Sequence, residues 1–113
     1  MIEINIAKDY TKTPGGRFKK EGEFSGEDFR EKILIPKYLE SEKKGVKLRV
    51  NLDGGYGYGS SFLEESFGGL VRQLKKVNID NIIIISEEEP KLIDDIKNYI
   101  KDALSVMGVA NND

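Results

Sequence analysis

Two adjacent serines, Ser60 and Ser61, are the residues of this chain best placed to do chemistry. They follow a loop with glycine at positions 54, 55, 57 and 59, and apolar residues at helical spacing begin directly after them. A serine at a helix start can cap the helix, help to bind an anion there, or accept a phosphoryl group on its hydroxyl.

The composition narrows the chemistry open to these serines. The 113 residues include no cysteine and no histidine, which excludes a disulfide, a thiolate metal site and a Ser–His–Asp triad within the chain. The net charge of −2 and the pI near 5.3 argue against nucleic acid as the main partner. No apolar run approaches membrane-spanning length, and the first ten residues indicate a strand rather than a signal peptide. We therefore expect a cytoplasmic, non-enzymatic protein without cofactor, metal, nucleic acid or membrane partner.

The glycine loop shares part of its spacing with phosphate-binding loops. Gly54 and Gly59 are spaced as in a P-loop, but Ser60 stands where the P-loop lysine would follow. The dinucleotide-binding fingerprint fails as well, because Phe62 occupies the third glycine position after Gly57 and Gly59. A small nucleotide- or phosphate-binding enzyme built on this loop is the alternative function.

A phosphorylation switch is a second interpretation of the serine pair. If Ser61 is the N-cap, Glu64 at the N3 position completes a capping box, and Ser60 lies just outside the helix with a free hydroxyl. A phosphate on Ser60 would add a charge of about −1.5 to −2, which the positive end of the helix dipole tolerates. Simple capping needs no function at all, and the local residues leave both interpretations open.

Apolar periodicity predicts the elements that position this loop. Strands are expected at 2–6, 46–52 and 82–85, a short edge strand at 17–20, and helices at 26–44, 61–76 and 90–104. Pro36 should kink or break the first helix near Ile35, and Leu39 should continue its apolar stripe. The four isoleucines at 82–85 indicate a central strand covered on both faces. Strands that alternate with helices predict an α/β fold with a mainly parallel sheet.

Three stretches carry a family resemblance. The chain contains TPGGR at 13–17, SGEDFREK at 25–32 and LDGGYGYGSSFLEESFGGL at 52–70. Together they resemble bacterial STAS-like domains of unknown function, related to the STAS (sulfate transporter and anti-sigma-factor antagonist) superfamily. The resemblance covers roughly residues 1–100 and implies a small STAS-like α/β domain, a single sheet with three helices. We expect this domain to span residues 1–108 and residues 109–113 to form a flexible tail.

The resemblance also implies a function. In antagonist-type STAS proteins, the first serine of the pair is phosphorylated by a partner kinase that also serves as the anti-sigma factor, and by position that serine is Ser60. It implies a regulatory protein–protein interaction module whose partner is an ATP-binding kinase of the anti-sigma type; a homodimer stays open. The chain departs from the superfamily pattern at Gly59, where an acidic residue is usual, and at Phe62, where a glycine is usual.

The expected partner-binding loop is the serine pair with its neighbours: Asp53, Tyr56, Tyr58, Ser60, Ser61 and Phe62. The two tyrosines either anchor an interface or fold back over the sheet edge. Asp53 is either an acidic partner of the serines or a turn former.

The remaining polar and small residues near the loop have simpler interpretations. Glu64 and Glu65 are expected to compensate the helix dipole, and Glu87–Glu89 to form a solvated lead-in to the last helix. Gly68 and Gly69, in mid-helix, indicate that another backbone packs closely there.

Overall fold

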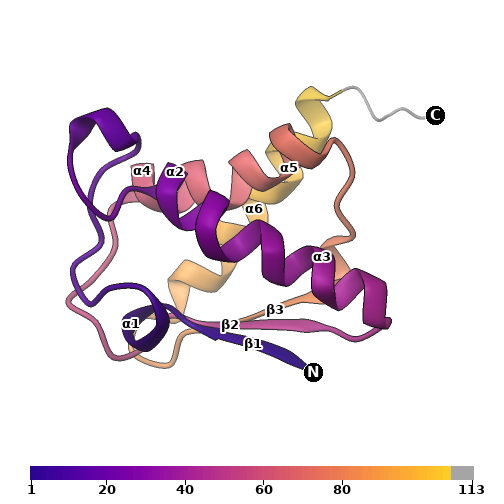
Figure 1. Ribbon diagram of the computed structural model, residues 1–113, viewed down its shortest axis with the longest axis horizontal. Coiled ribbons are helices and arrows are strands. Elements are labelled where there is room, and N and C mark those ends of the chain that lie inside the picture. Colours follow the sequence, from indigo (N-terminus) through magenta and orange to yellow (C-terminus); the bar gives the residue numbers. More distant parts are fainter. Residues whose placement is uncertain (108–113) are drawn as a thin grey trace.

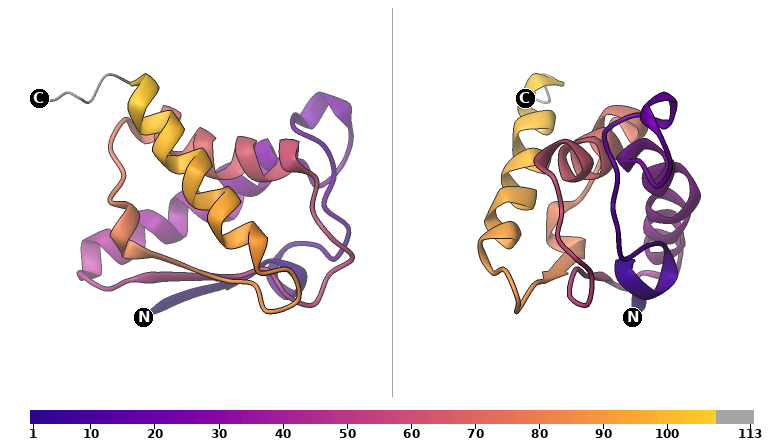
Figure 2. Two further views of the ribbon diagram at one scale, coloured as in Figure 1. Left: turned by 180° about the vertical axis from the view of Figure 1, so that it is seen from behind. Right: turned by 90° about the vertical axis from the view of Figure 1, so that its left-hand side faces the viewer.

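The computed structural model describes residues 1–107, which form a three-stranded parallel sheet with its long helices on one face (Figures 1 and 2). The strands are β1 (Ile2–Asn5), β2 (Leu48–Asn51) and β3 (Ile82–Ile85), in the order β1-β2-β3. The predicted α/β class is confirmed, and all three strands are parallel. The tail predicted at 109–113 lies outside the described residues.

The sheet is covered on one face. Residues in register at the middle of the strands, Ile4, Val50 and Ile84, are buried beneath the helices. Their neighbours Ile83 and Ile85 are only half-buried, because they point to the face that no helix of residues 1–107 covers. The prediction of a central strand covered on both faces was therefore wrong: β3 is an edge strand, and β2 is the central one.

The first long helix runs from Gly26 to Lys44 without a break. It consists of α2 (Gly26–Phe29), a π-helical segment η2 (Arg30–Leu34) and α3 (Ile35–Lys44). The side chain of Ser25 accepts a hydrogen bond from the Asp28 amide, so Ser25 is the N-cap of this helix. Pro36 falls in the first turn of α3, directly after the π segment. The predicted break is therefore absent, and the helix changes from π-helical to α-helical hydrogen bonding just before Pro36, a residue that has no N–H.

The π segment also changes which face of α3 is buried. Tyr38 is 2% exposed, whereas Leu39, which the apolar stripe was expected to include, is 48% exposed. A π turn takes more residues than an α turn, so it rotates every later side chain about the helix axis.

The second long helix has the same composite form. It joins α4 (Ser60–Leu63), a π-helical segment η3 (Glu64–Gly68) and α5 (Gly69–Leu74). The third, α6 (Lys91–Val106), is a regular α-helix with Pro90 at its N-cap. It buries Leu92, Ile96, Ile100 and Ala103 against the core, and Ile93, Tyr99 and Leu104 are partly buried beside them.

The segment between β1 and α2 is irregular. A single turn, α1 (Ile6–Asp9), follows β1, and the edge strand expected at 17–20 is absent: a short 3₁₀ turn, η1 (Lys19–Glu21), stands there. A second 3₁₀ turn, η4 (Ile79–Asn81), leads into β3. In Figures 1 and 2 the loop that carries η1 projects beside the starts of α2 and α4.

The change in the buried side of α3, from Leu39 to Tyr38, can be tested directly. Tyr38→Ala should lower the free energy of unfolding by roughly 3–5 kcal/mol, because a large buried ring is removed. Leu39→Ala, the matched control one residue away, should change it by less than about 0.5 kcal/mol. Urea denaturation followed by circular dichroism measures both. Equal losses in the two variants would contradict the face that the π segment sets.

Candidate functional site

The glycine loop begins where β2 ends, and Asp53 fixes its base. The two carboxylate oxygens of Asp53 accept hydrogen bonds from the backbone amides of Glu87 (3.1 Å) and Glu88 (3.0 Å). In return, the Gly54 amide donates to the Glu88 carboxylate at 3.0 Å. Asp53 therefore joins the loop after β2 to the loop after β3, which makes it a turn-stabilising residue rather than a partner of the serines.

Two further contacts shape the loop. The Tyr56 amide donates to the Lys12 carbonyl at 2.9 Å, and the Tyr58 hydroxyl donates to the Leu52 carbonyl at 2.8 Å. Gly54 and Gly57 have φ angles of +100° and +117°, which favour glycine. The loop is therefore held at both ends, with its two sharpest bends at glycines.

The two tyrosines have different roles. Tyr58 is half-buried, and burial raises the pKa of its hydroxyl well above the usual range, with the nearby Asp53 and Glu88 carboxylates acting in the same direction. Tyr56 is 83% exposed. Tyr58 thus covers the end of the sheet, and Tyr56 is the tyrosine that a partner could contact.

The structure places both serines inside the helix. Gly59 is the N-cap, in an extended conformation, and makes no side-chain capping bond; Ser60 and Ser61 are the first two helical residues. The capping box predicted for Ser61 and Glu64 was therefore wrong, because the Glu64 carboxylate is bound by two arginines instead. Both serines are exposed, and within residues 1–107 neither hydroxyl has a hydrogen-bond partner.

Phe62 is a correction to the expected partner-binding loop. It is completely buried and stacks on Phe29 of α2, with ring centroids 5.8 Å apart. Tyr58 lies 6.0 Å away on another side of its ring, and Tyr10 contacts Phe29 at 5.4 Å. This row of aromatic rings ties the serine end of α4 to α2 and to the segment after β1. Phe62 therefore holds the start of α4 in place and is not available to a partner.

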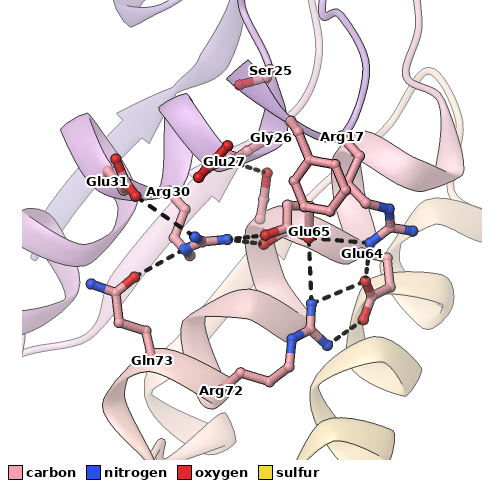
Figure 3. A network of polar contacts seen from close by, with 12 residues as sticks. Arg17, Ser25, Gly26, Glu27, Arg30, Glu31, Glu64, Glu65, Arg72 and Gln73 are labelled. Atoms are coloured by element: carbon pink, nitrogen blue, oxygen red, sulfur yellow. Dashed lines mark hydrogen bonds and ion pairs between the residues drawn. The ribbon is translucent and has the colours of Figure 1, made fainter. Parts of the chain in front are cut away.

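Figure 3 shows a network of three arginines and two glutamates, and the two glutamates lie one turn after the serine pair along the helix. Arg17 Nη1 is 2.5 Å from Glu64 Oε1 and 3.2 Å from Glu65 Oε1. Arg72 binds Glu64 through two nitrogens, at 2.7 and 3.1 Å. Arg30 Nη1 is 2.6 Å from Glu65 Oε2. We call these five residues the arginine–glutamate network.

The centre of the network is buried. Arg30 and Glu65 are each 8% exposed. Arg30 also donates to the Glu65 carbonyl at 2.8 Å and to the Gln73 side chain at 3.1 Å, so its fork is nearly filled. Because Arg30 belongs to the first long helix and Glu65 to the second, the pair fixes how the two helices lie against each other.

Two glycines make room for these side chains. A Cβ at Gly68 would collide with the Glu64 carboxylate, and a Cβ at Gly69 would collide with the Arg30 guanidinium. The prediction that another backbone packs against this glycine pair was wrong. The close backbone approach occurs instead at Gly26, where a Cβ would meet the Phe62 carbonyl.

The ion pairs of the network shift the pKa values of its partly exposed members, Glu64 and Arg17. The hydrogen bond from Arg72, aided by that from Arg17, holds the pKa of the Glu64 carboxyl below its usual value, although partial burial acts in the opposite direction. The same carboxylate raises the pKa of Arg17. Glu64 is thus an ion-paired residue, where the sequence had indicated one that compensates the helix dipole.

A small cavity of about 180 Å³ lies beside the loop, between the ends of β2 and β3. Its lining includes Asp53, Glu88 and Glu89, together with Tyr56 and Tyr58. Pockets for drug-sized ligands are usually about 300–1,000 Å³, and the acidic lining disfavours phosphate. Among residues 1–107 there is no cluster of acidic side chains suited to a metal ion, and no helix there is long and apolar enough to span a bilayer.

Sequence reasoning identified the serines and missed the arginines. Arg17, Arg30 and Arg72 are 13 or more residues apart, so no periodicity connects them. One signal was available: a pair of glycines in mid-helix, about one turn after two adjacent glutamates, indicates bulky side chains that cross the helix surface.

The residues of this site coincide with the stretches that carried the family resemblance. A family model described as "STAS-like domain of unknown function (DUF4325)" matches residues 25–92. The chain belongs to this family. Searches of curated proteins and of solved structures found no match. The STAS-like match runs from Ser25, the N-cap of α2, to Leu92 in α6, and so contains both long composite helices and the serine loop.

The buried ion pair gives a second test. Arg30→Gln should lower the free energy of unfolding by about 3–5 kcal/mol, because the Glu65 carboxylate is left buried without its guanidinium. Lys32→Gln, which removes an exposed ion pair with Asp28 on the same helix, should cost less than about 1 kcal/mol. Chemical denaturation at pH 7 compares them. A small loss in Arg30→Gln would mean that the network contributes little to the fold.

The ion pairs that Glu64 makes with Arg17 and Arg72 give a prediction of how stability depends on pH. The folded-state pKa of Glu64 lies below its unfolded value of about 4.3, so its contribution to stability is present above that pH and is lost as the pH falls through the folded value. Glu64→Gln should therefore be less stable than the wild type at pH 7, and the difference should shrink toward pH 3. Glu23→Gln, which removes a carboxylate outside the ion pairs of residues 1–107, should show no such convergence.

Proposed function

We propose that this STAS-like domain is a regulatory protein-interaction module that is switched by phosphorylation of Ser60. The observation that carries the proposal is the position of Ser60: an exposed serine, without a hydrogen-bond partner in residues 1–107, at the first position of a helix whose base is fixed by buried contacts. A kinase needs a hydroxyl that it can reach, and a switch needs a modification that the fold survives.

The helix start can accept a phosphate without unfolding. A phosphoserine would carry about −1.5 to −2 charges, and the helix dipole would favour it by roughly 0.3–1 kcal/mol at an exposed site. The helix continues for fifteen residues, from Ser60 to Leu74, and its buried side carries Phe62 and Glu65. The phosphate would therefore change the surface and leave the core as it is.

The surroundings of Ser60 suit a protein partner. Tyr56 is exposed on the same loop, and tyrosine is enriched at the centres of interfaces. The expected partner is an ATP-binding kinase of the anti-sigma type, which would bind the unmodified domain and release the phosphorylated one. A nucleotide-binding enzyme is less well supported, since the cavity at the loop is small and acidic.

Site mapping with a candidate kinase tests the modification. Incubation with the kinase and ATP should place phosphate on Ser60, as located by mass spectrometry of peptides. Ser60→Ala should abolish the incorporation, and Ser61→Ala, its neighbour on the same exposed helix start, should retain it. Incorporation that survives in Ser60→Ala would overturn the assignment.

A binding measurement tests the switch. Ser60→Asp should lower the affinity for the partner by about tenfold or more, equivalent to 1.4 kcal/mol, by placing a negative charge where the partner contacts a neutral hydroxyl. Calorimetry against the purified partner measures the change, with Ser105→Asp on α6 as the control. Unchanged affinity in Ser60→Asp and in the phosphorylated protein would refute the switch.

A further inference from the structure

We infer that Arg17 is the receiver of the phosphate on Ser60: it would exchange its ion pair with Glu64 for one with the phosphate. The inference rests on the proposed modification of Ser60 and names the residue through which that modification is transmitted. It gives the loop that carries Arg17, outside the serine loop itself, a role in the switch.

The spacing of the helix brings the phosphate to Arg17. Ser60 and Glu64 are four residues apart on one helix, so their side chains are neighbours, with Cβ atoms about 5–6 Å apart. Arg17 Nη1 lies 2.5 Å from Glu64 Oε1. A phosphate on Ser60 would therefore share its face of the helix with a carboxylate that already holds a guanidinium.

The charges favour the exchange. Phosphoserine and Glu64 would repel each other as an i, i+4 pair of anions, and a cation between them relieves the repulsion. A phosphate carries more charge than a carboxylate and binds the guanidinium fork in the same bidentate way. Glu64 is not left unpaired when Arg17 turns away, because Arg72 keeps both of its hydrogen bonds to that carboxylate.

Of the three arginines, Arg17 is the best placed to reach the phosphate, because its side chain is partly exposed and comes from another segment of the chain. Its side chain is 31% exposed, whereas that of Arg30 is 10% exposed and is held by Glu65 and Gln73. Arg72 lies three turns beyond Ser60 on the same helix, on the far side of Glu64. A phosphate on Ser61 would instead be the i+4 neighbour of Glu65, which is paired mainly with the buried Arg30 at 2.6 Å and is farther from Arg17, at 3.2 Å, than Glu64 is.

The consequence reaches a second surface. Arg17 lies 6.0 Å from the ring of Phe18, which is 36% exposed beside η1, and Lys20 lies 5.8 Å from the same ring. Movement of Arg17 toward Ser60 would withdraw one of these two cations from Phe18. A phosphate at the start of α4 would thus alter the surface around Phe18, which belongs to the segment before α2.

The test is a ³¹P NMR titration of protein that carries phosphoserine at position 60, installed by genetic code expansion, with neither kinase nor partner. Contact with Arg17 should lower the second pKa of the phosphate below its ordinary value of about 6, and Arg17→Gln should raise it by about one unit. Arg72→Gln removes the same charge from the other side of Glu64 and should shift it much less. Equal shifts in the two variants, or none in Arg17→Gln, would overturn the inference.

A measurement on the unsubstituted protein covers the case in which Arg17→Gln does not fold. In ¹⁵N-labelled protein, phosphorylation of Ser60 should move the side-chain Nε–Hε resonance of Arg17 and leave that of Arg30 in place. No movement for Arg17 would also overturn the inference. Neither experiment involves a partner protein. A negative result in either would therefore overturn the role of Arg17 and leave the proposed function standing, whereas a partner that does not respond to the modification would contradict the proposed function without changing either NMR result.

Discussion

The architecture of this domain depends on one buried ion pair between its two composite helices. Arg30 and Glu65 meet at 2.6 Å with 8% of each residue exposed, and the carbonyl of Glu65 and the side chain of Gln73 take further donors of the same guanidinium. A buried charge is costly unless it is paired, so neither residue can move without the other. The pair therefore ties the two helices together in the position observed, with Gly69 leaving the space that the guanidinium needs.

That constraint separates a rigid base from an accessible surface. Below the serines, Phe62 stacks between α2 and the glycine loop, and Asp53 ties this loop to the one after β3. On the outer side of the site, the side chains of Ser60, Ser61 and Tyr56 are exposed. The outer ion pairs lie between the two, since Glu64 and Arg17 are partly exposed. A site with this arrangement can change its surface charge while its backbone stays in place, which is the property that a reversible interaction module requires.

Local sequence patterns predicted where the helices and strands lie better than which side of each one is buried. The strands expected at 2–6, 46–52 and 82–85 and the three long helices were all recovered to within a few residues, because their periodicity depends on neighbours within a turn or a strand. The π segments were not predicted, since a π turn leaves no periodic mark of its own, and the burial of Tyr38 in place of Leu39 follows from one of them. The assignment of β3 as a central strand failed because an unbroken apolar run does not reveal which strands lie beside it.

The sequence by itself determined the α/β class, the parallel order of strands and helices, and a serine pair that opens a helix after a glycine loop. It determined these because strand and helix periods, turn residues and caps act over a few positions. Only the tertiary structure decided that Gly59 rather than Ser61 is the N-cap of the helix, that Phe62 faces inward, and that the three arginines converge on two glutamates. These outcomes depend on residues up to 48 positions apart, whose charges find each other only when the helices pack.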